Sequence, residues 1–279
     1  MFLDAHNHLQ DDRFAGGQTA LLTASEEAGV TRMVVNGTCE SDWPAVLALA
    51  RQSALVLPSF GLHPWFVRAR TPDWQATLLR HLDAMPAAVG EFGLDRWILE
   101  RGKNLPGPPP APLPEQEEVF LWQLHLAAER DRPASLHCLQ AWGRLYELLR
   151  EHPRPACGFL LHSFGGPVEL VPALARLGAY FSFPGSFAHA RKARQREAFR
   201  HCPPDRLLLE TDAPDQLPPD ALVRHPLTDA ATGKALNHPA NLPAIYEFLA
   251  GFLGASEASL SARVAENFHR LFGGQTLPS

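Results

Sequence analysis

Eight short apolar segments recur along the chain, and longer amphipathic segments separate them. This alternation predicts parallel β-strands joined by crossover helices. The expected strands are Phe2–Ala5, Arg32–Asn36, Val56–Gly61, Ala88–Glu91, Ala134–His137, Gly158–His162, Tyr180–Phe183 and Leu207–Glu210. The expected helices are Thr19–Ala28, Trp43–Gln52, Pro72–Ala84, Glu115–Arg130, Ala141–Glu151, Pro167–Arg176, Arg191–His201, Leu242–Leu253 and Ser256–Leu271. Eight strands in this order favour a closed (β/α)8 TIM barrel, an α/β fold, over an open doubly wound sheet.

The length of the chain supports one domain over residues 1–279, because 279 residues suit a single barrel of this kind. The proline-rich stretch Asn104–Pro114 breaks the alternation. Proline lacks the amide donor that helices and central strands require, so we expect a loop insertion at about 103–114 on the active-site face. We expect no membrane span and no signal peptide, and therefore a cytoplasmic protein, because the opening MFLDAHNHL soon turns polar.

Composition narrows the possible ligands. A net charge of −5 argues against a general polyanion binder, so metal ions and a local basic rim would have to attract a nucleic acid. The four cysteines are scattered and are expected to be reduced thiols. Neither a P-loop nor a dinucleotide fingerprint occurs, so we expect no nucleotide cofactor.

Metal-binding residue types fall at the carboxyl ends of five expected strands. Barrel enzymes build their sites at this face, so these side chains should converge. Taken alone, each of these residues could instead have a structural role. The H-x-H pair could be two hydrogen-bonded polar groups, and Asp212 could cap a turn. Their co-occurrence favours a metal site made of His6, His8, Glu91, His137, His162 and Asp212.

Imidazoles and carboxylates without thiolates suit Zn²⁺, Mn²⁺, Fe²⁺ or a magnesium-like ion. Two such ions can hold a water near neutral pKa, and Asp212 is expected to accept its proton. We expect Glu91 to bridge the ions, because none of the lysines stands at an expected strand end. The arrangement inferred puts His6, His8 and Asp212 on one ion, and His137 and His162 on the other.

These residues and their surrounding motifs resemble those of the TatD family of metal-dependent deoxyribonucleases. The strings LDAHNHL, GLHPW, VGEFGLD, SLHC, LHSFGG, LLLETDAP and NHPANLP carry the resemblance from Leu3 to about Leu242. It implies a TIM barrel, the same six ligands, and hydrolysis of single-stranded DNA as a 3′–5′ exonuclease. It also implies two divalent ions, with Mg²⁺ expected first and Zn²⁺ or Mn²⁺ as alternatives. Asp212, Glu91 and His63 would be catalytic, and His63 would face the scissile phosphate.

Two departures from the family pattern affect the expected substrate. The family reads GLDY where this chain has Gly93-Leu94-Asp95-Arg96. It reads RNEP where this chain has Leu236-Asn237-His238-Pro239. Arg96 and Asn237 join His63 as candidate substrate contacts, since an arginine offers forked donors to a phosphate. Two alternatives stay open: a metal-dependent hydrolase of a small amide, lactone or phosphoester, and a subunit of a larger nucleic-acid-processing or defence assembly.

Two further features have an ordinary and a functional explanation. The basic run Arg191–Arg200 is either a solvated helix face or a guide for a DNA backbone. Trp65, Phe66, Trp97 and Trp142 either pack in the protein or stack on nucleobases.

Overall fold

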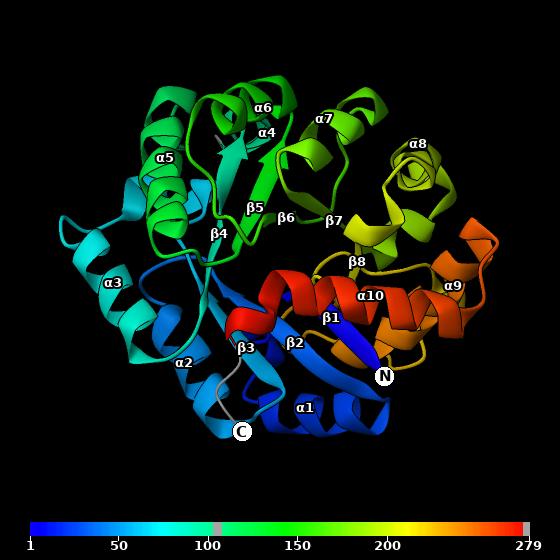
Figure 1. Ribbon diagram of the computed structural model, residues 1–279. Helices are drawn as coiled ribbons and strands as arrows, with labels where there is room; N and C mark the ends of the chain where they lie inside the picture. Colours follow the sequence, from blue (N-terminus) through cyan, green and yellow to red (C-terminus); the bar gives the residue numbers. More distant parts are fainter. Residues whose placement is uncertain (103–107, 276–279) are drawn as a thin grey trace.

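The computed structural model describes residues 1–102 and 108–275. Eight parallel strands form one sheet in sequence order, and each strand pairs with the next (Figure 1). They are β1 (Phe2–Asn7), β2 (Val30–Gly37), β3 (Val56–Phe60), β4 (Ala88–Asp95), β5 (Ala134–Leu139), β6 (Phe159–Leu161), β7 (Ala179–Pro184) and β8 (Leu207–Glu210). The predicted (β/α)8 barrel is thereby confirmed.

Helices alternate with the strands and surround the sheet (Figure 1). They are α1 (Gln18–Glu27), α2 (Trp43–Gln52), α3 (Trp74–Ala84), α4 (Trp97–Arg101), α5 (Leu113–Glu129), α6 (Trp142–Glu151), α7 (Val171–Arg176), α8 (Ala193–Glu197), α9 (Leu242–Leu253) and α10 (Glu257–Phe272). A two-residue pair, β9 (Leu227–Thr228) and β10 (Ala235–Leu236), forms a small antiparallel hairpin after β8. Within residues 1–102 and 108–275, no helix has the length and apolar character needed to cross a membrane.

The barrel closes where the segment after β8 meets β1. The backbone N–H of Asp212 donates to the carbonyl of His6 at 2.9 Å, and the N–H of His8 donates to the carbonyl of Ala213 at 2.8 Å. These bonds join the two ends of the sheet at its carboxyl edge. They bring three of the predicted ligands together.

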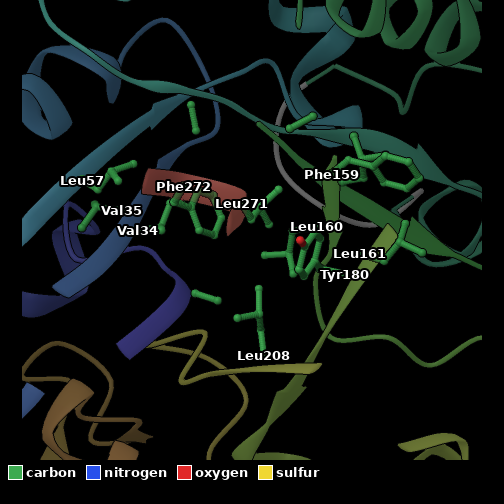
Figure 2. Packing of buried hydrophobic residues seen from close by; sticks show 14 of the residues in the cluster. Val34, Val35, Leu57, Phe159, Leu160, Leu161, Tyr180, Leu208, Leu271 and Phe272 are labelled. Atoms are coloured by element: carbon green, nitrogen blue, oxygen red, sulfur yellow. The ribbon is translucent and has the colours of Figure 1, made fainter. Parts of the chain in front are cut away.

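The strands are buried along almost their whole length, as expected of parallel strands covered by helices. Leu271 and Phe272 of α10 belong to the same apolar core as Val34 and Leu160 of the strands (Figure 2). The side chain of Asn267 in α10 donates to the carbonyl of Leu207, where β8 begins, at 2.8 Å. The last helix therefore lies at the amino end of β8 and leaves the carboxyl face free for a site.

Several predicted boundaries differ from the structure, and three of them bear on the residues near the site. The fourth strand runs on from Glu91 to Asp95, because Gly93 lets β4 pass close to the backbone of β5. The proline-rich loop ends earlier than Pro114, since α5 begins at Leu113; a proline is tolerated in a first turn, where its missing N–H has no helical partner. Residues 103–107 of that loop lie outside the described residues.

The expected helix over Arg191–His201 is instead α8 flanked by 3₁₀ turns at Ala190–Lys192 and Ala198–Arg200. The guanidinium of Arg196 donates to the carbonyls of Phe187 and His189 at 2.6 and 3.1 Å. These contacts tie the run to the segment that follows β7.

Candidate metal centre

The first group of ligand atoms comes from β1, β4 and the segment after β8. The Nε2 atom of His8 lies 3.3 Å from Oε2 of Glu91 and 3.4 Å from Oδ1 of Asp212. The Nε2 atom of His6 lies 3.4 and 3.7 Å from the same two oxygens. Ligands that share one ion at about 2.1 Å stand this far apart, so the four side chains fit a single cation.

The second group surrounds the other oxygen of Glu91. Oε1 of Glu91 lies 2.7 Å from Nε2 of His162 and 3.0 Å from Nδ1 of His137. The two imidazole nitrogens are 3.2 Å apart. Glu91 therefore turns one carboxylate oxygen toward each group of imidazoles.

His63 lies within the same cluster, because its Nε2 atom is 3.4 Å from Oε1 of Glu91. Its other nitrogen, Nδ1, accepts the backbone N–H of Trp65 at 3.2 Å. A neutral imidazole that accepts at Nδ1 carries its proton on Nε2. His63 thus presents an N–H donor to the centre, whereas a ligand presents a lone pair.

The electrostatics of the cluster are dominated by burial and by close imidazoles. Burial raises the pKa of Glu91, but His162, His63 and His6 outweigh it and hold that pKa well below its usual range. Burial lowers the pKa of His8, yet hydrogen bonds to Asp212 and Glu91 raise it well above normal. Among the described residues, Glu91 and Asp212 form ion pairs with imidazoles alone.

His63 behaves differently from His8. Burial lowers its pKa to about 4, so the ring is neutral at pH 7 and keeps the single N–H described above. Without a metal ion, only protonated imidazoles could balance the charge of the Glu91 and Asp212 carboxylates, because imidazoles are their only ion-pair partners among the described residues. A divalent cation would supply that charge from the same donor atoms, so the residues present fit a metal ion.

Further side chains fix the orientation of the ligands. Nδ1 of His8 donates to the carbonyl of Asn36 at 2.8 Å, which leaves the lone pair of Nε2 toward the centre. Nε2 of His137 lies 3.1 Å from Oδ2 of Asp95 and donates to that carboxylate, so Nδ1 can ligate. Nδ1 of His6 lies 2.8 Å from the hydroxyl of Ser135.

Sequence reasoning missed the part of Asp95. The predicted strand ends at Glu91, whereas Glu91 lies in the middle of β4. Alternate residues of a strand point to one side, so Glu91, Gly93 and Asp95 share the face that looks into the site. A longer fourth strand would have revealed Asp95 as a partner for a ligand.

A cavity of about 980 Å³ opens over the centre. Its lining includes five of the six predicted ligands, all except His6, together with His63. Arg96 is exposed and lies outside this lining. Asn237 is buried, and its Nδ2 donates to the carbonyl of Thr211 at 2.7 Å, so it supports the residue before Asp212.

The basic run divides into two parts. Lys192 and Arg194 line the cavity. Arg196 bonds to backbone carbonyls, and the guanidinium of Arg200 lies 4.0 Å from the ring centroid of Phe252. In the second half of the run, Arg196 and Arg200 therefore contact the protein itself, whereas Lys192 and Arg194 in the first half line the cavity.

Comparison with known proteins agrees with this geometry. A family model described as TatD related DNase matches residues 3–273. The protein named 3′-5′ ssDNA/RNA exonuclease TatD of Escherichia coli K12 is 31% identical, over 95% of this chain and 96% of its own length. The uncharacterized metal-dependent hydrolase YjjV of the same organism is also 31% identical, over 77% of this chain and 80% of its own.

Solved structures give the same result. The crystal structure of YjjV, a TatD homologue from Escherichia coli K12, superposes with a TM-score of 0.84 at 25% identity and covers 99% of this chain and 98% of that one. The TatD family hydrolase of Entamoeba histolytica has a TM-score of 0.81 at 18% identity, over 97% of each chain, and shows the shared fold. Since the family model and these relatives span most of its length, the chain belongs to the TatD family of metal-dependent hydrolases.

Proposed function

We propose that this chain is a metal-dependent nuclease that hydrolyses phosphodiester bonds of single-stranded DNA from the 3′ end. The observation that carries the proposal is Glu91, which directs one oxygen to His8 and the other to His162 at 3.3 and 2.7 Å. The named activity of the TatD relative supports the substrate. A cytoplasmic location is part of the same proposal, and cell fractionation would test it.

Two divalent ions, with Mg²⁺ first and Zn²⁺ or Mn²⁺ as alternatives, would be held by the two groups of donors. One would bind His6, His8 and Asp212, the other would bind His137 and His162, and Glu91 would contact both. When bound, such ions lower the pKa of water and offset the charge of a phosphate.

The side chains of the protein supply the remaining steps. Oδ1 of Asp212 faces the imidazoles of His6 and His8, which leaves Oδ2 to accept a proton from the attacking water. The N–H at Nε2 of His63 would donate to a phosphate oxygen, because its Nδ1 already accepts from Trp65. Lys192 and Arg194 would hold phosphates at the cavity wall.

The test begins with protein stripped by a chelator and reloaded with Mg²⁺, Mn²⁺ or Zn²⁺. Oligonucleotides labelled at the 5′ end should then shorten stepwise from the 3′ end. Glu91→Ala and Asp212→Ala serve as controls, purified by the same route. Equal activity of these variants and the wild type would reject the proposal, because contaminating nuclease would then explain the signal.

The number of ions has its own test. Equilibrium dialysis followed by elemental analysis should find two ions per wild-type chain. His8→Ala and His137→Ala should each retain one, since each removes a ligand of a different group. A wild-type value of one would leave the hydrolytic proposal standing and remove the second ion.

A small phosphoester or similar small molecule is a second candidate substrate. The observation in its favour is that the uncharacterized metal-dependent hydrolase YjjV has the same 31% identity to this chain as the named exonuclease, although over 77% of the chain instead of 95%. A panel of small phosphoesters, amides and lactones, assayed beside oligonucleotides with the same metal-loaded sample, separates the two. Turnover of a small ester without any DNA degradation would favour this candidate.

A further inference from the structure

Trp65 is an exposed indole held in a fixed position at the rim of the cavity. It follows β3, lines the cavity, and is 42% exposed. Its Nε1–H donates to Oδ2 of Asp95 at 2.6 Å. Trp97 lies nearly parallel to it, with ring centroids 6.3 Å apart and an interplanar angle of 24°. Exposure of so large an apolar ring is unfavourable, so a ring both exposed and oriented indicates a contact surface for a ligand.

Trp65 lies next to His63, which belongs to the cluster around Glu91. Its ring meets that of His63 edge to face, with centroids 5.4 Å apart. Nε2 of His63 in turn lies 3.4 Å from Glu91. A flat group resting on Trp65 would therefore be adjacent to the bond cleaved at the centre. A nucleobase is such a group, since every base has a face that stacks on an indole.

Lys192 and Arg194 stand on the other side of the cavity. They follow β7, which is four strands from β3 in the eight-stranded barrel, so the two loops face each other across its mouth. Among the described residues, neither cation has a carboxylate within 4 Å, whereas Arg13, which lines the same cavity, is paired with Asp11 and Asp215. Unpaired cations in a cavity suit the phosphates of a backbone.

We propose that a single strand crosses the mouth of the barrel from Trp65 to Lys192 and Arg194. The base of the 3′-terminal nucleotide stacks on Trp65, and the phosphates that precede the scissile bond lie against the two cations. The strand continues on the cation side because the exposed Arg191 extends the basic surface there. This inference rests on the proposed nuclease function and identifies the residues that select a single-stranded end.

The test compares two oligonucleotides that differ at one position. One has a normal 3′-terminal nucleotide, and the other ends in an abasic residue. Trp65→Ala should lower kcat/KM on the normal strand by about tenfold or more relative to its value on the abasic-ended strand, and any loss shared by both strands reports the missing bond to Asp95. Trp65→Phe, which keeps a ring, should recover most of the loss. Equal losses on both strands would overturn the stacking contact.

The contacts of Lys192 and Arg194 with phosphates are tested by the salt dependence of KM. Lys192→Ala and Arg194→Ala should raise KM on both strands alike and make the logarithm of KM less dependent on the logarithm of salt concentration. Arg200→Ala is the matched control, because it belongs to the same run but lies over Phe252. An unchanged salt dependence in the Lys192 and Arg194 variants would overturn the proposed strand path.

A binding measurement separates this inference from the proposed function. Fluorescence anisotropy with labelled strands protected by 3′ phosphorothioate linkages reports binding when cleavage is slow. Tighter binding of the normal end that depends on Trp65, in a protein that cleaves no DNA, would support the strand path and reject the nuclease. Cleavage with no preference for a terminal base would support the nuclease and overturn the placement on Trp65.

Discussion

Asp4 and Thr211 lie 207 positions apart in the sequence, yet they form two hydrogen bonds in the folded protein. The carboxylate of Asp4 accepts from the backbone N–H of Thr211 at 2.9 Å and from its hydroxyl at 2.5 Å. Burial raises the pKa of Asp4 to about 7 despite these bonds. The pair connects β1 to the segment after β8, directly beside His6 and Asp212.

Thr211→Val should destabilise the protein by about 1–2 kcal/mol, because a buried carboxyl group loses a hydrogen-bond donor without a change of side-chain shape. Metal affinity should also fall, since Asp212 follows Thr211. Denaturant unfolding monitored by circular dichroism measures the first effect. Thr31→Val, an exposed threonine in β2, is the control and should change stability by less than about 0.5 kcal/mol. Equal effects of the two changes would mean that the Asp4 contact adds nothing.

Asp95→Asn should weaken metal binding by about 10- to 100-fold, because Asp95 orients His137 through a contact of 3.1 Å. The fold should survive, since asparagine can still accept hydrogen bonds. Calorimetric titration of the stripped protein with Mn²⁺ measures the affinity. Asp215→Asn at the cavity edge, where Asp215 pairs with Arg13, should leave it unchanged. Wild-type affinity in the Asp95 variant would refute an orienting role.

Gly93→Ala should prevent stable folding. A Cβ atom at Gly93 would lie 1.9 Å from the backbone oxygen of His137, so β4 and β5 would have to separate. Gly251→Ala in α9 is the opposite case, because no atom lies within 4 Å of its Cβ position. That change should stabilise by about 0.5–1 kcal/mol through helix propensity. Soluble yield and thermal unfolding report both results, and a normally stable Gly93 variant would contradict the close approach of the two strands.

His238 should make stability depend on pH. Burial lowers its pKa to about 4, below the 6.5 of an unfolded histidine. Below pH 6.5 the unfolded chain binds a proton that the folded protein refuses until about pH 4. The stability present above pH 6.5 is therefore lost as the pH falls toward 4.

His238→Asn tests this dependence, since asparagine can still cap the turn by accepting the N–H of Ala240. The difference in unfolding free energy between pH 7 and pH 5 should shrink by on the order of 1 kcal/mol in this variant, allowing for the solvent exposure of the ring. Urea titrations of metal-free protein at both pH values provide the comparison. Parallel pH profiles for the two proteins would exclude His238 as the source.

Most of the barrel followed from local patterns. The alternation of apolar strands and amphipathic helices placed every strand, and the span of β8 at Leu207–Glu210 was predicted correctly. Hydrophobic periodicity depends on neighbouring residues, so it can be recognised in a single sequence. The end of β4 was not predicted, because it depends on the close approach of the backbone at His137, far away in the sequence. The break-up of the helix around α8 was not predicted either, and there Arg196 donates to the nearby carbonyl of Phe187.

The sequence alone determined the residue types of the centre and their places after strands, since strand polarity sends carboxyl ends to one face of a barrel. Tertiary structure decided which atom of each side chain turns toward the others. It set the two oxygens of Glu91 between separate groups of imidazoles and placed Asp95 behind His137. Those choices depend on distances between strands far apart in the chain, and no local pattern encodes such distances.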